Sequence, residues 1–385
     1  MNKQVANSQL MQKMNRLKVL NYVRRHPNAS RPVIAKETGL SLPSITNIIT
    51  YLTSIGILHQ SGTEVVNRAG RKSALLRLNP SLYDFLCIYF GENSVVLART
   101  DLEGNILETT DFSIHDMSSD TITEKLCDTA LNLVNASSKI LAIGIAISGL
   151  VLPDNRFVMS ARHKLKSFDI VRILKEKTNI PVFVDNTSLL KAVYYFAKND
   201  TVSKENTLFV DLENGVGAVQ YLNGTIIKAT TGEIGHTTVD KDGPPCFCGN
   251  RGCLEALCSP RQIVSLYKEL SGHTATLEEI QHLQSKGDKY AREAILHCGQ
   301  YLGIGLQTLV NLFNPSVIVI NTGDYTDCPS LIDAAAEEMK RRAYTSLTDG
   351  ISLIYNNTKT DAILGITYNL FDKVFDIAFP HNIVE

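Results

Sequence analysis

Apolar positions near the start of the chain recur with the three- and four-residue spacing of α-helices, as Leu17, Leu20 and Val23 illustrate. Ser30 can cap the start of a helix, and Gly39 can end one. On this pattern we predict helices over residues 14–25, 30–38 and 41–54. Helix, glycine turn and helix in succession are typical of a helix-turn-helix.

The third predicted helix has an apolar face and a polar face. The polar face carries short hydrogen-bonding side chains, namely Ser44, Thr46, Asn47 and Thr50. Side chains of this kind can reach phosphates and base edges in a major groove, so we predict that they bind DNA. The alternative is a three-helix packing unit whose polar face is only solvated.

A β-hairpin is predicted after the helices, with strands over residues 57–60 and 74–78. Its tip carries the basic residues Arg68, Arg71 and Lys72. A hairpin in this place is a wing, and Arg71 beside a glycine could enter a narrow minor groove. The alternative is an ordinary basic loop. Asn79 and Pro80 mark the boundary, so residues 1–80 are predicted to form a winged helix-turn-helix DNA-binding domain.

From residue 85 onward, short apolar strands alternate with amphipathic helices. Strands are predicted over residues 85–90, 95–100, 140–147, 181–184, 207–211, 217–222 and 317–321. Helices are predicted over residues 118–134, 188–198, 262–270, 288–313 and 360–375. This alternation indicates an α/β fold, and no repeat of short period is visible.

Charge is unevenly distributed along the 385 residues. Residues 1–80 contain twelve Lys and Arg and two Glu, a balance of +10, whereas the remainder carries 26 basic and 37 acidic residues, a balance of −11. A small basic region joined to a larger acidic body indicates a polyanionic partner for the first region only.

The expected location is the cytoplasm. The chain has no apolar run long enough to span a bilayer, and its polar N-terminus is unlike a secretory signal. Its eight cysteines fit a reducing compartment better than a disulfide scaffold. Five of them are scattered in apolar surroundings and are predicted to be small core residues: Cys87, Cys127, Cys258, Cys298 and Cys328.

The other three cysteines lie close together, ten or more residues after a histidine. His236, Cys246, Cys248 and Cys253 match the ligand set of a closed tetrahedral zinc site. Because no open coordination position is implied, we predict a structural Zn²⁺. The alternatives are a disulfide, or three buried free cysteines beside an unrelated histidine.

The stretch 232–255 also resembles a family signature. Gly-Glu-Ile-Gly-His, followed by Cys-x-Cys-Gly-Asn-x-Gly-Cys-Leu-Glu, is similar to the signature of the ROK (repressor, open reading frame, kinase) family. The resemblance implies a two-lobed, actin-like domain of the ribonuclease H-like, sugar-kinase type. We expect one lobe over residues 81–190 plus 362–385, and a second over 191–361 with its zinc loop at 236–253. Family members are sugar kinases, or dimeric regulators with an additional DNA-binding domain.

The kinase machinery of the family is altered at every matched position. Two phosphate loops, the nucleotide-side glycines and the catalytic base correspond to residues 89–93, 213–217, 322–324 and 185–187. Glu92 and Glu213 place carboxylates where phosphates would lie, which is repulsive. Thr187 stands where the family has its base and cannot act as one. We therefore expect no kinase activity.

Sugar recognition is the function that the resemblance leaves in place. Family positions that contact sugar hydroxyls correspond to Asn186, Glu233, His236 and Glu255. Arg162, His163 and Lys164 add positive charge nearby, and favour a phosphorylated or acidic sugar as one hypothesis. The alternative is that both glutamates only brace the zinc loop and no ligand binds.

These features together predict a transcription regulator, in the first instance a repressor, of carbohydrate metabolism genes. It would bind double-stranded operator DNA as a homodimer or dimer of dimers. A sugar or sugar-phosphate effector in the cleft of an inactive ROK domain would control it. The alternative is a ROK sugar kinase with a divergent ATP site.

Overall fold

The computed structural model describes residues 3–65, 72–152, 154–160, 163, 165–166, 169–199, 206–213, 215–227, 232–325, 328–344, 346–357 and 361–377. Its contacts divide the chain into two compact units. The first comprises Met1–Ala146, Asp169–Val184 and Ile363–Glu385, and the second Ile147–Phe168 and Asp185–Ala362. Among the helices so described, none combines the length and hydropathy needed to cross a bilayer.

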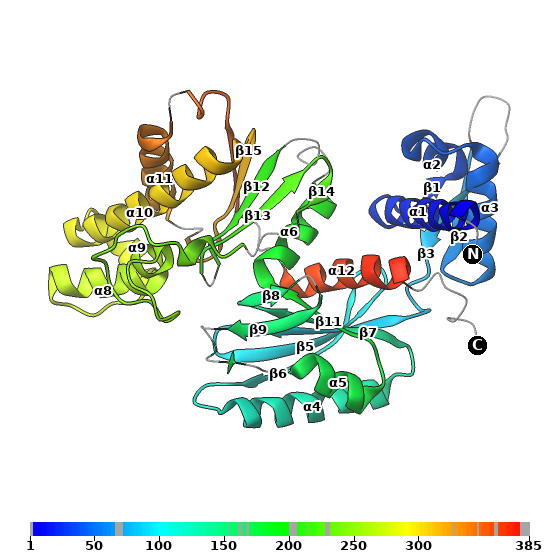
Figure 1. Ribbon diagram of the computed structural model, residues 1–385, viewed down its shortest axis with the longest axis horizontal. Helices are drawn as coiled ribbons and strands as arrows, with labels where there is room; N and C mark the ends of the chain where they lie inside the picture. The colour runs from blue at the N-terminus through cyan, green and yellow to red at the C-terminus, as the bar shows by residue number, and fades with distance from the viewer. Residues whose placement is uncertain are drawn as a thin grey trace. The chain divides into compact units, whose positions relative to one another are not determined.

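The N-terminal region consists of three helices and a small antiparallel sheet (Figure 1). The helices are α1 (Lys3–Arg25), α2 (Arg31–Thr38) and α3 (Leu42–Ser54). The strands are β1 (Ala29–Ser30), β2 (Leu58–Val65) and β3 (Lys72–Leu78), in the order β1-β3-β2. The three predicted helices and the hairpin are therefore present. The predicted start of the first helix at residue 14 was wrong, because the helix begins at Lys3.

Local sequence accounts for the boundaries of these helices. The Ser41 hydroxyl accepts a hydrogen bond from the Ser44 backbone amide at 3.3 Å and so caps α3. Gly39 ends α2 with a φ of 69°, a conformation that favours glycine. Between the helices lies an apolar core that includes the buried residues Leu20, Ile34, Ile45, Ile49 and Leu52.

Arg24 links the end of α1 to α12 (Ala362–Ile377), the last helix of the chain. It donates to the backbone oxygen of Tyr368 and to Asp372 Oδ1, both at 3.2 Å. Its guanidinium also lies 4.3 Å and 4.4 Å from the ring centroids of Tyr368 and Phe371. Burial lowers the pKa of Arg24, an effect that the Asp372 carboxylate opposes.

The first unit also contains a five-stranded sheet, in the order β11-β7-β4-β5-β6. Its strands are β4 (Asp84–Phe90), β5 (Ser94–Asp101), β6 (Ile106–Ser113), β7 (Ile140–Ile147) and β11 (Val182–Asn186). Figure 1 shows α12 on one face of this sheet, and α4 (Ser119–Ala136) and α5 (Ile170–Thr178) on the other. Strands β4 and β7 are parallel, whereas β4-β5 and β5-β6 are antiparallel.

The second unit contains another five-stranded sheet, in the order β14-β13-β12-β15-β16. Its strands are β12 (Thr207–Asp211), β13 (Gly217–Leu222), β14 (Thr225–Ile226), β15 (Val317–Asn321) and β16 (Ser352–Asn356). Alternate residues of β12 enter different cores, as expected for a strand covered on both faces. Leu208 and Val210 belong to one core, and Phe209 packs with Tyr195 and Phe196 of α6 (Thr187–Lys198) in the other.

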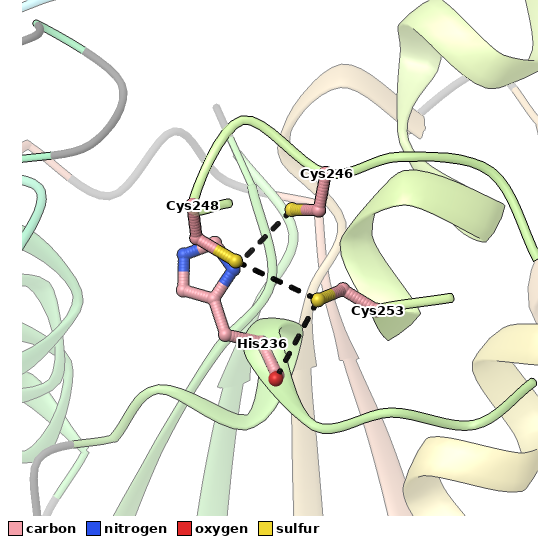
Figure 2. A group of neighbouring side chains, drawn as sticks. All are labelled: His236, Cys246, Cys248 and Cys253. Atoms are coloured by element: carbon pink, nitrogen blue, oxygen red, sulfur yellow. Dashed lines mark hydrogen bonds between the residues drawn. The ribbon is translucent and has the colours of Figure 1, made fainter. Parts of the chain in front are cut away.

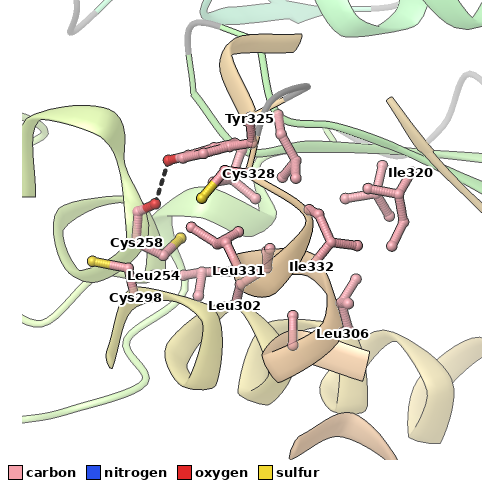
Figure 3. Packing of buried hydrophobic residues seen from close by; sticks show 14 of the residues in the cluster. Leu254, Cys258, Cys298, Leu302, Leu306, Ile320, Tyr325, Cys328, Leu331 and Ile332 are labelled. Carbon is pink, nitrogen blue, oxygen red and sulfur yellow. Dashed lines mark hydrogen bonds between the residues drawn. The ribbon is translucent and has the colours of Figure 1, made fainter. Parts of the chain in front are cut away.

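The larger core of the second unit is formed mainly by α10 (Lys289–Phe313) and α11 (Pro329–Arg342), as Figure 3 shows in part. The shorter helices α7 (Leu254–Cys258), α8 (Pro260–Ser271) and α9 (Leu277–Ser285) contribute to it. Cys258, Cys298 and Cys328 lie in this core, and Cys87 and Cys127 are also buried. The prediction that these five cysteines are small core residues is confirmed.

The remaining elements were not predicted from the sequence. They include β8 (Leu150–Leu152), β9 (Arg156–Ser160) and β10 (Leu165–Lys166), which form a small antiparallel sheet, and two short 3-10 helices, Ile234–His236 and Gly323–Tyr325. Strands β6 and β16 and helix α11 were also missed. Strand β6 is mostly exposed, so its sequence lacks the apolar run by which the other strands were found.

Candidate functional site

The predicted metal ligands come together in the second unit (Figure 2). One ligand atom from each of His236, Cys246, Cys248 and Cys253 lies within 4.8 Å of the other three. The sulfurs of Cys248 and Cys253 are 3.7 Å apart, and Cys246 Sγ is 3.7 Å from His236 Nδ1. All three thiols are free, so the disulfide alternative does not apply to them.

This arrangement fits a tetrahedral metal ion. A Zn–S bond of about 2.3 Å places two sulfurs of a tetrahedron roughly 3.8 Å apart, close to the Cys248–Cys253 separation. Burial raises the pKa of Cys253 to about 12, and the neighbouring Cys248 and Cys246 thiols contribute to that rise. A bound cation would compensate the mutual repulsion of three thiolates, so the residues can hold a metal.

Backbone geometry holds the cysteines of the loop in place. Thr238 pairs with Cys253 and Pro245 with Arg251 in two isolated β-bridges. Gly252 has a φ of 62°, and a Cβ atom there would lie 1.4 Å from the backbone oxygen of Asp240. The loop can therefore close around the ligand atoms only with glycine at this position.

A polar pocket adjoins the His236, Cys246, Cys248 and Cys253 cluster and lies entirely within the second unit. It is lined by Ser148, Gly149, Asn186, Ser188, Glu213, Gly215, Val216, Gly217, Gly232, Glu233, His236, Phe247 and Glu255. All four residues that the resemblance assigned to sugar binding are among them. The described lining contains three carboxylates and neither Lys nor Arg. It is therefore rich in acceptors for hydroxyl donors.

The acceptor groups are held by hydrogen bonds. Asn186 donates through Nδ2 to the Gly149 backbone oxygen at 3.0 Å and to Glu233 Oε1 at 3.2 Å. Glu255, which is buried, accepts from the Val216 amide at 3.4 Å. Burial, assisted by the charge of Glu255, raises the pKa of Glu233 to about 7. The Nε2 atom of His236 lies 3.7 Å from Glu233 Oε2. With Nδ1 facing the cysteines, the imidazole thus joins the metal cluster to the pocket.

The buried cation Lys191 is a feature of this region that the sequence reasoning missed. Its Nζ lies 3.2 Å from Asp211 Oδ2 and 2.8 Å from Glu213 Oε2. Asp211 also accepts from Ser188 Oγ at 3.0 Å and from Asn321 Nδ2 at 2.8 Å. The sequence does contain a signal for this buried lysine, because Lys191 interrupts the apolar face of the helix predicted over 188–198.

Thr187, at the position of the family's catalytic base, is buried and is not part of the described pocket lining. Its hydroxyl oxygen has no hydrogen-bond partner in the described part of the chain. Residues 89–93, matched to the family's first phosphate loop, include the end of β4 and the tight turn before β5, which is closed by a hydrogen bond from the Gly91 amide to the Ser94 backbone oxygen at 2.9 Å.

The predicted DNA-contacting residues of α3 are placed as expected on its surface. Thr46, Asn47 and Thr50 are exposed and Ser44 is half-buried. The hydroxyls of Thr46 and Thr50 donate to backbone oxygens one turn earlier, at 2.8 Å each, and keep their lone pairs for an incoming donor. Arg68 and Arg71 lie outside the described residues, as do Arg162 and Lys164; Lys72 begins β3.

The ROK family model matches residues 85–363. The chain belongs to the ROK family. Curated relatives extend the match beyond that range and into the N-terminal region. The xylose repressor of Bacillus subtilis is 25% identical over 387 residues, covering 97% of this chain and 99% of the repressor. The N-acetylglucosamine repressor of Escherichia coli O157:H7 is 26% identical over 353 residues, covering 87% of this chain and 86% of the relative.

Solved structures share the fold of this ROK protein. A ROK family transcriptional regulator, described as a homologue of the E. coli MLC protein, matches with a TM-score of 0.79 and 23% identity, over 95% of this chain and 97% of its own. A ROK family glucokinase from Streptomyces griseus, in complex with glucose and AMPPNP, matches with a TM-score of 0.63 and 19% identity, over 74% of this chain and 98% of its own. At these identities the likeness concerns the fold.

Proposed function

We propose that this ROK protein is a transcription regulator, acting as a repressor, whose binding to operator DNA is controlled by a sugar. The observation that carries the proposal is that repressors of the family match nearly the whole chain, including the basic N-terminal region. The kinase of known structure covers 74% of the chain, whereas the repressors cover up to 97%. The additional segment is where a regulator differs from a kinase.

The N-terminal region has the properties of a winged helix-turn-helix. Helix α3 would enter a major groove with Asn47 and its polar neighbours toward base edges, while the basic hairpin between β2 and β3 contacts an adjacent groove or phosphates. A balance of +10 within residues 1–80 supplies the non-specific attraction to phosphates. Because operators are paired half-sites, this mode of binding calls for a two-fold symmetric protein, and hence for a dimer.

The pocket beside the metal cluster would hold the effector. Its carboxylates and amide suit a neutral polyhydroxylated ring, because each hydroxyl can donate to a charged acceptor. The described lining gives less support to a phosphorylated sugar, since it offers a phosphate acidic side chains and neither Lys nor Arg to pair with. The names of the relatives suggest D-xylose and N-acetyl-D-glucosamine as the first compounds to test.

The bound metal would be a structural Zn²⁺. Its ligands would be Cys246, Cys248, Cys253 and His236 Nδ1, which leave no open coordination position for chemistry. Through Nε2 the same histidine would face the effector and Glu233. The metal would therefore orient a ligand-binding side chain rather than activate a substrate.

Phosphoryl transfer is not part of the proposed function. Thr187 has no basic group, and Glu213, in the second phosphate loop, is held by Lys191. These features support a domain that binds sugar without transferring phosphate to it. The effector would act only through its different affinities for the DNA-binding and the free arrangements of the dimer.

The test is a gel-shift titration on the DNA upstream of the protein's own gene, at several salt concentrations and with either sugar. We expect specific binding that weakens steeply with salt and falls when the cognate sugar is added. Asn47→Ala should weaken specific binding by roughly 10- to 100-fold, because one base contact contributes about 1–3 kcal/mol. Asn132→Ala, at an exposed position on α4, is the matched control. Consumption of ATP with any of these sugars would refute the proposal.

A further inference from the structure

Phe247 is the middle residue of the Cys246-Phe247-Cys248 segment, and the residue is 46% exposed. A large apolar residue therefore stays partly open to solvent, on a loop whose two neighbouring side chains point to the predicted metal site (Figure 2). The ring also lines the polar pocket, together with Glu233, Glu255 and Asn186. Exposure of a large apolar side chain costs free energy, and in a ligand pocket it is a common sign of a binding surface.

The orientation of this ring is fixed from two sides. Its centroid lies 5.4 Å from that of the His236 imidazole, at an interplanar angle of 87°, which is an edge-to-face contact. Its backbone is held because Cys246 and Cys248, on either side, are both in the cluster. The metal loop thus sets the position of the aromatic ring as well as that of the imidazole.

The pocket therefore combines two complementary surfaces. Carboxylates and the Asn186 amide form hydrogen-bonding surfaces, and the Phe247 ring forms an apolar one. A pyranose has the same division, with hydroxyls around its edge and C–H groups on its faces. An aromatic ring packs against such a C–H face through dispersion and the burial of apolar surface.

We propose that Phe247 is an effector-binding residue whose ring packs against the apolar face of a neutral pyranose held by the pocket. The inference rests on the proposed sugar-binding function and adds a contact to it. It also restricts the ligand class, because sugars with an unbroken C–H face fit the ring better than those with an axial hydroxyl on that face. Phe247 links the metal to the effector, so loss of the metal displaces this contact together with His236.

The chain offers a direct measurement, because it contains no tryptophan. Phe247→Trp places a single indole in the pocket of the full-length, zinc-loaded protein. Titration with D-xylose, D-glucose and N-acetyl-D-glucosamine should give a saturable change in emission and protection from acrylamide quenching. The control is Tyr344→Trp, since Tyr344 is 73% exposed and is not among the pocket-lining residues. Its emission should not respond to sugar.

Isothermal titration calorimetry on variants without the added tryptophan measures the affinity for sugar directly. Phe247→Ala should bind the best of the three sugars roughly 10- to 100-fold more weakly than wild type, with unchanged zinc content. Phe247→Leu, which keeps an apolar side chain of smaller area at this position, should lie between them. If wild type binds a sugar and both variants bind it equally well, the role of Phe247 is refuted and sugar binding stands. If wild type binds none of the three, the sugar-binding proposal fails and this inference fails with it.

Discussion

The two five-stranded sheets of this chain share the same strand order but carry different side chains at the carboxyl end of their first strand. Numbered in sequence order within each sheet, both follow the arrangement 3-2-1-4-5, as β6-β5-β4-β7-β11 and β14-β13-β12-β15-β16. In each, the first strand is antiparallel to the second and parallel to the fourth. The backbone plan was used twice, but among the described lining residues one follows the first strand only in the second sheet, where Glu213 comes shortly after β12.

The difference lies at the carboxyl end of the first strand. In the first sheet, β4 ends at the buried Phe90 and continues into a tight turn, and its buried carboxylate, Asp84, is at the opposite end with Arg99. In the second sheet, β12 ends at buried Asp211, which pairs with Lys191. Ligands of open α/β sheets bind beyond the carboxyl ends of the strands. The two copies therefore differ in what their first strand presents at that end: an apolar residue and a tight turn in one, and carboxylates held by Lys191 in the other.

The largest expected effect concerns the buried ion pair of the second sheet. Lys191→Met should lower the free energy of unfolding by about 3–5 kcal/mol, because it leaves Asp211 uncompensated in the core. Lys198→Met, an exposed position on the same helix, should change it by less than about 0.5 kcal/mol. Urea denaturation measures both. If the uncompensated carboxylates cause the lower stability, adding Asp211→Asn and Glu213→Gln to Lys191→Met restores part of the free energy of unfolding.

Metal removal should have the next largest effect and should act on the second unit. With free Zn²⁺ at 100 times its dissociation constant, binding stabilises the native state by about 2.7 kcal/mol, and a chelator should remove that contribution. Differential scanning calorimetry with and without chelator measures the loss. Cys253→Ser should abolish the response to chelator, whereas Cys127→Ser, in the first unit, should leave it intact. An unchanged transition in chelator-treated wild type would contradict a structural metal.

The smallest of the three effects concerns the first sheet. A Cβ at Gly144 of β7 would lie 2.3 Å from Ile366 Cγ2 and 3.0 Å from Leu370, both on α12. Gly144→Ala should therefore destabilise the protein by about 1–2 kcal/mol through overpacking. Gly62→Ala is the control, because the nearest atom to its Cβ would be a Leu75 methyl at an ordinary 3.9 Å. Equal urea midpoints of unfolding for the two variants would show that the packing of α12 on β7 does not require glycine at position 144.

The predictability of the elements followed their local signals. Residues 207–211, 217–222 and 317–321 were predicted with the bounds that the structure has, because continuous apolar runs between polar residues mark buried strands. Strand β6 and helix α11 were missed. The exposed strand lacks the apolar run, and in α11 small alanines among charges make up half of the apolar positions, so the apolar face is weak in the sequence.

The sequence by itself determined the polar face of α3 and the cluster of one histidine and three cysteines that could hold a metal ion. Both depend on spacing along one short segment, which backbone geometry converts directly into proximity. It also carried the family signature. Only the tertiary structure decided the rest of the site. The pairing of Lys191 with Asp211, the hydrogen bonds of Asn186 to Gly149 and Glu233, and the shared order of the two sheets all join separate elements of the chain. Such contacts are set by which surfaces pack together, a property of the whole fold that no local spacing encodes.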